Sequence, residues 1–370
     1  MRQAKGYEIL DEKTGKPLVM KLRKSLYGLR QSPRNWGNAF AKGIADIGFV
    51  ALKSDPCMYV YGSGPTHAIL CVYVDDCTIA GKTRSVVQDL KDKLASKFKM
   101  TDGGPAKLLL GMQIAQKDGE ITVSQHNYVL EILEKFKMQD CKPVSTPGSG
   151  PEIEKESENA ILLDEAETKV YQGIVGSLLF LTNTTRWEIG YATMILCRGM
   201  SKPTNHHMAG AKRVLRYLKG APDMPITFRR GQQWDLHGYC DSNFAGSGEE
   251  LRKRSTTGYI FTLAGGVVSA ASTLQKLTAQ SSTHAEIIAM ATAAREALYL
   301  QGVVSELGFP CAKTPIFSDS TGALSAAGNN AFRGRNKFIS TRYWLVRECV
   351  EKRLLALHYC RTKYVLFVAL

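Results

Sequence analysis

The sequence predicts a multidomain chain of the α+β and α/β classes. Its 370 residues are about two to three times the commonest domain size, so two or three compact domains are expected. Two short apolar runs on either side of an acidic pair predict a β-hairpin in the first third, whereas residues 171–217 are patterned as helix. Beyond residue 234, short strand-like runs flank one alanine-rich helical segment, which predicts a separate α/β domain.

The composition is that of a folding chain with a strong basic excess. Hydrophobic residues make up 44% and charged residues 22%, close to ordinary globular proteins. Lys and Arg number 48 against 34 Asp and Glu, and the resulting net charge of +14 favours polyanionic partners such as nucleic acid or an acidic membrane surface. The longest apolar runs are far shorter than the roughly 18 residues that span a bilayer, so no membrane span is expected.

The N-terminus and the cysteines favour an intracellular protein with free thiols. Residues 1–8 lack the apolar core of a signal peptide, so we expect the protein to stay inside the cell. The nine cysteines are scattered, with no Cys-x-x-Cys and no cysteine pair joined to spaced histidines. Neither a zinc site nor a disulfide framework is therefore predicted.

Asp75 and Asp76 lie between the two apolar runs, residues 68–74 and 77–81. Adjacent carboxylates repel each other unless exposure or a cation relieves the repulsion. Mg²⁺ prefers carboxylate and phosphate oxygens, and two such ions can clamp the attacking and leaving oxygens of phosphoryl transfer. The alternative is a solvated hairpin turn, although tight turns prefer Asn-Gly or Asp-Gly. The residues alone leave both interpretations open.

A second acidic set consists of Asp241, Glu286 and Asp319. The two aspartates each end a short apolar run typical of a strand, and Glu286 heads an apolar helical stripe that should face the sheet, so the three carboxylates can converge. The alternative for Glu286 is a capping box with Thr283, and strand-tip aspartates often serve as turn residues. On the residues alone, these structural roles are favoured.

A basic run near the end of the helical segment offers a further surface. Its cations are interleaved with Tyr217, and contact with a nucleic-acid backbone is one interpretation. The other, favoured by the residues alone, is a solvated helix face. The cations concerned are Lys212, Arg213, Arg216 and Lys219.

Several motifs, in order along the chain, resemble the Pol polyprotein of copia-type LTR retrotransposons. Residues 24–36 (KSLYGLRQSPRNW) and 73–76 (YVDD) are similar to its reverse transcriptase. The resemblance extends from residue 1 to about residue 362. Matching segments after the polymerase and in the ribonuclease H region are residues 141–147, 175–181, 211–220, 255–259 and 281–286.

The resemblance implies a partial reverse-transcriptase palm with thumb-like and connection segments, followed by a ribonuclease H-like α/β domain. The implied domain bounds are 1–145 for the partial reverse transcriptase, 146–170 for an acidic linker, 171–233 for a helical connection, 234–362 for the ribonuclease H-like domain and 363–370 for a divergent tail.

The resemblance also implies roles for the acidic residues, all of them metal ligands. Asp75 and Asp76 would help to bind Mg²⁺ or Mn²⁺ for 3′-hydroxyl attack on an incoming nucleotide, with an RNA template and a DNA primer as partners. Asp241, Glu286 and Asp319 would bind the metal ions that cleave the RNA strand of an RNA–DNA hybrid. The motif that positions template and nucleotide is matched at Gly28, Gln31 and Arg34.

The sequence departs from the family pattern at both ends. A further metal-binding aspartate of the family lies upstream of the segment matched by residues 1–8, so the polymerase site is expected to be incomplete. Residues 337–340 replace the family's Lys-His-Ile-Asp, and residues 363–370 replace the stretch that carries a fourth ribonuclease H acid. We therefore expect an inactive polymerase and a weak or absent ribonuclease H. The alternative is a catalytically dead, domesticated or pseudogenic remnant that binds nucleic acid.

Overall fold

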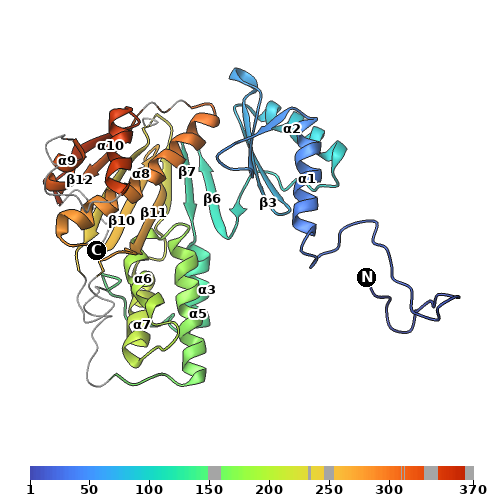
Figure 1. The fold of residues 1–370 in the computed structure, drawn as a ribbon, viewed down its shortest axis with the longest axis horizontal. Coiled ribbons are helices and arrows are strands. Elements are labelled where there is room, and N and C mark those ends of the chain that lie inside the picture. The colour runs from blue at the N-terminus through green and yellow to red at the C-terminus, as the bar shows by residue number, and fades with distance from the viewer. Residues whose placement is uncertain are drawn as a thin grey trace. The chain divides into compact units, whose positions relative to one another are not determined.

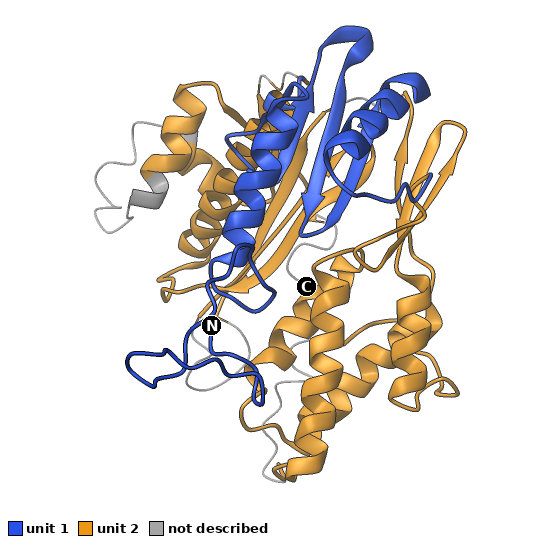
Figure 2. Cartoon of the chain, turned by 90° about the vertical axis from the view of Figure 1, so that its right-hand side faces the viewer, with its two compact units in different colours: residues 1–104, 306–308 blue, residues 105–305, 309–370 orange. Residues whose placement is uncertain are grey.

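The computed structural model describes residues 1–148, 160–231, 235–245, 254–309, 311, 313–328 and 341–362. The chain divides into two compact units (Figure 2): Met1–Gly104 with Glu306–Gly308, and Pro105–Ser305 with Phe309–Leu370. Residues 149–159 of the predicted acidic linker, the segment 337–340 and the divergent tail lie outside the described residues.

The first unit is an antiparallel sheet in the order β1-β2-β3-β4, packed with two helices. Its core joins Phe40 and Ile44 of α1 to Leu70 of β3 and Leu90 of α2. Helix α1 begins at Ser32, and Pro33 lies in its first turn, where the missing N–H of proline costs nothing. The elements are α1 (Ser32–Ala45), β1 (Phe49–Ala51), β2 (Met58–Tyr61), η1 (Gly64–Thr66), β3 (Ala68–Tyr73), β4 (Asp76–Gly81) and α2 (Arg84–Lys97).

The second unit begins with a small antiparallel sheet and a group of helices that share one core. β7 pairs with β8, and Glu120 lies opposite Arg229, so strands more than 100 residues apart form one sheet. This pairing joins residues before position 145 to residues after it, so the predicted domain boundary at residue 145 lies inside the second unit. The elements are β5 (Leu108–Leu109), β6 (Met112–Lys117), β7 (Glu120–Ser124), α3 (His126–Lys135), α5 (Glu165–Thr182), η2 (Trp187–Ile189), α6 (Gly190–Arg198), α7 (Asn205–Gly220) and β8 (Ile226–Arg229).

Helix α5 begins inside the predicted acidic linker. The Asp164 side chain accepts a hydrogen bond from the N–H of Glu167 (2.8 Å), and the Glu167 side chain accepts one from the N–H of Asp164, which completes a capping box. Residues 165–170 are therefore helical, and part of the acidic charge serves to start a helix.

The rest of the second unit is a five-stranded sheet in the order β11-β10-β9-β12-β13. The first three strands pair antiparallel, whereas β12 runs parallel to both β9 and β13. Helix α8 lies against this sheet (Figure 1), and its Met290 and Ala294 share a core with Phe261 and Ile316. The elements are β9 (His237–Asn243), β10 (Thr256–Leu263), β11 (Gly266–Leu274), α8 (Ser282–Glu306), β12 (Thr314–Ser318), α9 (Thr321–Gly328), α10 (Thr341–Glu351) and β13 (Leu355–Tyr359).

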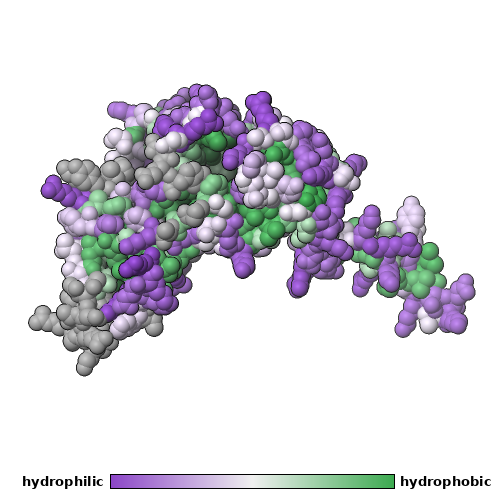
Figure 3. Space-filling view, turned by 90° about the horizontal axis from the view of Figure 1, so that it is seen from above, coloured by the Kyte–Doolittle hydropathy of each residue, from purple (hydrophilic) through white to green (hydrophobic). Residues whose placement is uncertain are grey.

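Hydrophobic side chains also reach the surface. In Figure 3 green side chains stand among purple ones on the N-terminal segment, where Tyr7, Ile9 and Val19 are exposed. Among the described helices, α8 alone is long and apolar enough to cross a membrane by length and composition. Its apolar side packs into the core of the second unit.

Candidate active site

Strand pairing brings Asp241 and Asp319 together. β9 and β12 are parallel, with Ile316 opposite Gly238 and Phe317 opposite Tyr239, so continuing this register sets residue 319 beside residue 241. Asp319 follows the last residue of β12, as predicted, whereas β9 continues for two residues beyond Asp241.

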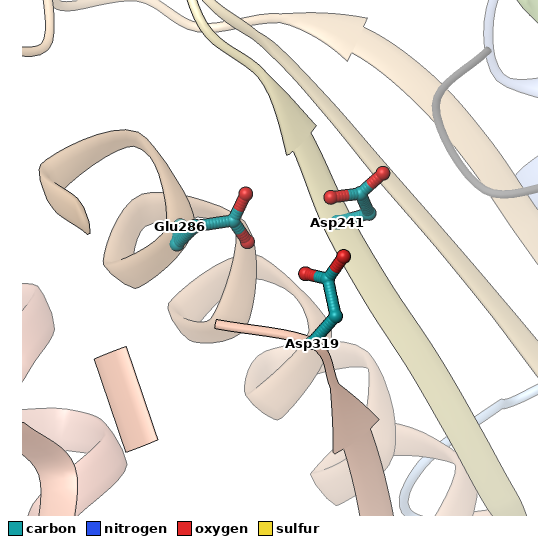
Figure 4. Close-up of side chains that lie close together, drawn as sticks. All are labelled: Asp241, Glu286 and Asp319. Atoms are coloured by element: carbon teal, nitrogen blue, oxygen red, sulfur yellow. The ribbon is translucent and has the colours of Figure 1, made fainter. Parts of the chain in front are cut away.

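Helix α8 supplies the third carboxylate. Glu286 lies in the second turn of α8 and is 8% exposed. One oxygen from each of Asp241, Glu286 and Asp319 lies within 4.8 Å of the others, and Figure 4 shows the three side chains directed toward one another. The predicted convergence of these acids is therefore present in the structure.

The hydrogen bonds of Glu286 exclude the capping-box alternative. Its Oε1 accepts hydrogen bonds from the N–H of Ser242 (3.1 Å) and from the Ser242 hydroxyl (2.7 Å). At the start of α8, the N–H of His284 donates instead to Oγ of Ser281 (3.2 Å). The carboxylate thus points to β9 and not back to the first residues of its own helix.

Two hydroxyls contact the acidic triad, which we define as Asp241, Glu286 and Asp319. Besides Ser242, the Thr362 hydroxyl donates a hydrogen bond to Oδ2 of Asp319 (2.7 Å). In contrast, Oε2 of Glu286 is buried and has no hydrogen-bond partner among the described residues. A buried oxygen without a donor is costly to keep ionised, and a cation would remove that cost.

The electrostatics of the triad also favour a cation. The pKa of Glu286 is raised to about 8, mainly by burial and also by the nearby Asp241 and Asp319, although the hydrogen bonds from Ser242 lower it. Burial is the main reason why the pKa of Asp241 is raised as well. Three converging carboxylates, two of them with raised pKa values, fit a hard divalent cation, which prefers oxygen ligands and supplies the missing positive charge.

In the first unit, Asp75 and Asp76 lie at the tip of the predicted hairpin. Tyr73 of β3 pairs with Asp76 of β4, so Val74 and Asp75 form the turn, and both aspartates are exposed. The Tyr27 hydroxyl donates a hydrogen bond to Oδ2 of Asp75 (3.0 Å), and this bond raises the pKa of Tyr27. Among the described residues, the triad of the second unit is the one group of three potential ligands close enough to share a metal ion.

The other predicted site residues of the first unit lie near the start of α1. Gly28 has a φ of +89°, which a glycine adopts without strain, and it follows the Tyr27 that contacts Asp75. Gln31 is the N-cap residue of α1, and Arg34 is exposed in its first turn.

The cations of α7 divide into structural and exposed groups. The Arg216 Nε–H donates to the carbonyl oxygen of Lys142 (2.7 Å), and Nη2 of Arg213 donates to Oγ1 of Thr146 (2.9 Å). These two arginines therefore fix the segment that follows α3, at Lys142 and Thr146, against helix α7. Lys212 is exposed, and Lys219 is half-buried.

Sequence comparison places the chain in a family. The family described as "Reverse transcriptase (RNA-dependent DNA polymerase)" matches residues 1–149. The chain is 36% identical over 357 residues to the retrovirus-related Pol polyprotein from transposon TNT 1-94 of Nicotiana tabacum, covering 95% of this chain. It is 32% identical to a putative transposon Ty5-1 protein of Saccharomyces cerevisiae, over 73% of this chain and 87% of that protein. The chain belongs to the copia-type Pol family.

The Pol chain described here spans 26% of the length of the tobacco polyprotein. Among solved structures, it resembles the foamy viral protease-reverse transcriptase in complex with an RNA/DNA hybrid, with a TM-score of 0.52 and 14% identity over 91% of this chain and 39% of that one. At this identity the likeness shows a shared fold alone.

Sequence reasoning did not assign Ser242, Thr362, Tyr27 or Trp36 to a site in this Pol chain. The side chain of each donates a hydrogen bond to a residue more than 35 positions away in the sequence, and for Trp36 the acceptor is Val74 in the turn beside Asp75. No spacing rule predicts such bonds. The one available signal was position, since Ser242 directly follows a predicted ligand.

Proposed function

We propose that the second unit of this Pol chain cleaves the RNA strand of RNA–DNA hybrids by divalent-metal-assisted hydrolysis. The observation that carries the proposal is the convergence of Asp241, Glu286 and Asp319 from three different elements, with Oε2 of Glu286 buried and without a hydrogen-bond partner. Mg²⁺ or Mn²⁺ suits this donor set because both prefer oxygen ligands.

The protein's own residues prepare the site. Asp241 and Asp319 are fixed by adjacent parallel strands, and Glu286 is fixed on α8 by Ser242, so the three carboxylates are held in place before any ligand arrives. Bound divalent ions supply charge neutralisation at the phosphate and a water that loses its proton near neutral pH. Burial of Glu286 keeps competing bulk water away from one side of the site.

The test is hydrolysis of a labelled RNA–DNA hybrid by the full chain with Mg²⁺ and with Mn²⁺. We expect slow cleavage of the RNA strand, faster with Mn²⁺ because it binds oxygen sites more tightly. Asp241→Asn, Glu286→Gln and Asp319→Asn should each abolish cleavage and leave hybrid binding intact or stronger, since fewer negative charges then face the phosphates. The matched control is Glu296→Gln, which removes a charge from the same helix at a residue bound to Ser269.

Two outcomes would overturn this proposal. Cleavage by the triad variants at the parent rate would assign the activity to another site. Hybrid binding without any cleavage by the parent chain would favour the alternative function, a remnant that binds nucleic acid without catalysis.

A second candidate function, RNA-templated DNA synthesis, is supported by the family match over residues 1–149 and by the exposed Asp75 and Asp76. Since the described residues bring no third ligand to this pair, we expect this chain alone to extend a primer on an RNA template poorly or not at all. Primer extension with Mg²⁺ and Mn²⁺ measures this. Robust synthesis that Asp75→Asn abolishes would contradict the expectation.

A further inference from the structure

Ser242 bonds to two members of the acidic triad at once. Its backbone N–H donates to Oδ1 of Asp241 (2.8 Å) and to Oε1 of Glu286 (3.1 Å), and its hydroxyl donates to the same Oε1 (2.7 Å). Both donors therefore act on one oxygen of Glu286, while the other oxygen, Oε2, is buried and receives no hydrogen bond from the described residues.

We infer that Ser242 is a positioning residue, which fixes the Glu286 carboxylate so that Oε2 is left for a divalent ion. A glutamate reaches the site through three rotatable side-chain bonds, so its two oxygens have no fixed order without a donor that selects one of them. The Ser242 hydroxyl makes that selection, and hydrogen bonds to an ionised acceptor are about twice as strong as neutral ones.

The inference rests on the proposed metal site but not on the identity of the substrate. Ser242 acts through Glu286, since both of its donors are engaged by triad carboxylates. Partners that orient metal ligands typically contribute 10–100-fold to metal affinity. Because the backbone N–H survives any side-chain substitution, removal of the hydroxyl alone should give an effect near the lower end of that range.

The chain contains a matched control for this hydroxyl. Ser269 on β11 donates a hydrogen bond of the same length, 2.7 Å, to Oε1 of Glu296 on the same helix, ten residues beyond Glu286. Ser269→Ala therefore removes a serine–glutamate bond between sheet and helix outside the triad. Ser242→Thr keeps a hydroxyl at the inferred position.

The experiment is a titration of the full chain with Mn²⁺ alone, followed by the paramagnetic resonance signal of free Mn²⁺, without nucleic acid. We expect Ser242→Ala to weaken Mn²⁺ binding about tenfold, Ser242→Thr to restore most of the affinity, and Ser269→Ala to bind like the parent. Thermal unfolding of the metal-free proteins should give similar midpoints for the two alanine variants.

The outcomes separate this inference from the proposed function. Equal Mn²⁺ affinities for Ser242→Ala, Ser269→Ala and the parent would overturn the role of Ser242, whatever the chain cleaves. Parent binding that Glu286→Gln weakens, without hybrid cleavage, would overturn only the proposed reaction. A parent chain that binds no Mn²⁺ would overturn the metal site and the inference together.

Discussion

The indole N–H of Trp36 donates a hydrogen bond to the carbonyl oxygen of Val74, 2.9 Å away. Val74 occupies the turn between β3 and β4 with a φ of +55°, a conformation that is rare for a β-branched residue. The bond links α1 to the tip of the hairpin that carries Asp75 and Asp76. Backbone strain of this kind persists only where surrounding contacts impose it, and Trp36 supplies one such contact.

Relief of this strain gives the first prediction. Val74→Gly should leave the free energy of unfolding unchanged or raise it by up to about 1.5 kcal/mol, because the left-handed conformation costs about 1–2 kcal/mol while glycine adds about 0.5–1 kcal/mol of unfolded-state entropy. Val50→Gly is the control. Val50 is as exposed as Val74 (64% and 63%), but it lies in strand β1 and not in the turn. Val50→Gly should lower the free energy of unfolding by about 1 kcal/mol. Urea unfolding measures the free energy of unfolding of both variants. Equal losses of stability would show that the backbone of Val74 is not strained.

The raised pKa of Glu286 predicts how stability depends on pH without metal. Its pKa rises from an ordinary 4.5 to about 8 in the folded chain. Between these values the folded state holds a proton that the unfolded state has released, so the free energy of unfolding falls as pH rises and levels off above pH 8. At 1.36 kcal/mol per unit, the whole fall is at most about 5 kcal/mol.

Urea unfolding in a chelator, from pH 5 to pH 9, measures this fall. In Glu286→Gln most of it should disappear, because an amide does not titrate in this range. Mg²⁺ or Mn²⁺ should stabilise the parent chain more at pH 8.5 than at pH 5, since a cation favours the ionised carboxylates. A Glu286→Gln variant with the parent's pH dependence would show that Glu286 does not cause it.

The sequence predicted the parts of the fold that depend on local patterning. The apolar runs on either side of Asp75 and Asp76 form the predicted hairpin, and Glu286 heads the apolar side of α8 as its spacing indicated. The pairing of Glu120 with Arg229 was not predictable, since strand partners 109 residues apart leave no periodic signal. For the same reason, the capping-box alternative for Glu286 was rejected only by its long-range bonds to Ser242.

The third prediction separates two basic residues of α7. Arg216→Ala should lower the free energy of unfolding by about 1–2 kcal/mol, because its Nε–H no longer bonds to the carbonyl of Lys142. Lys212→Ala should change it by less than about 0.5 kcal/mol, because that side chain is exposed. Urea unfolding compares the two, and equal losses would show that the Arg216 contact contributes nothing specific.

The last prediction concerns nucleic-acid binding by the whole chain. With a net charge of +14, the protein should bind an RNA–DNA hybrid or a DNA duplex without sequence preference, and affinity should fall steeply with salt as counterions are released from the phosphates. If Lys212 contacts a phosphate, Lys212→Ala should weaken binding to all sequences equally and reduce the slope of log affinity against log salt by about 0.9.

Fluorescence anisotropy across a salt series measures that slope. A suitable control is Lys169→Ala, because Lys169 forms an ion pair with Glu165 (2.7 Å) on the exposed side of α5, and it should leave the slope unchanged. A salt-independent affinity, or no binding at low salt, would remove the electrostatic basis of the prediction. If the affinity of the parent chain depends on salt but Lys212→Ala leaves the slope unchanged, the phosphate contact lies on another basic surface of the chain and not on α7.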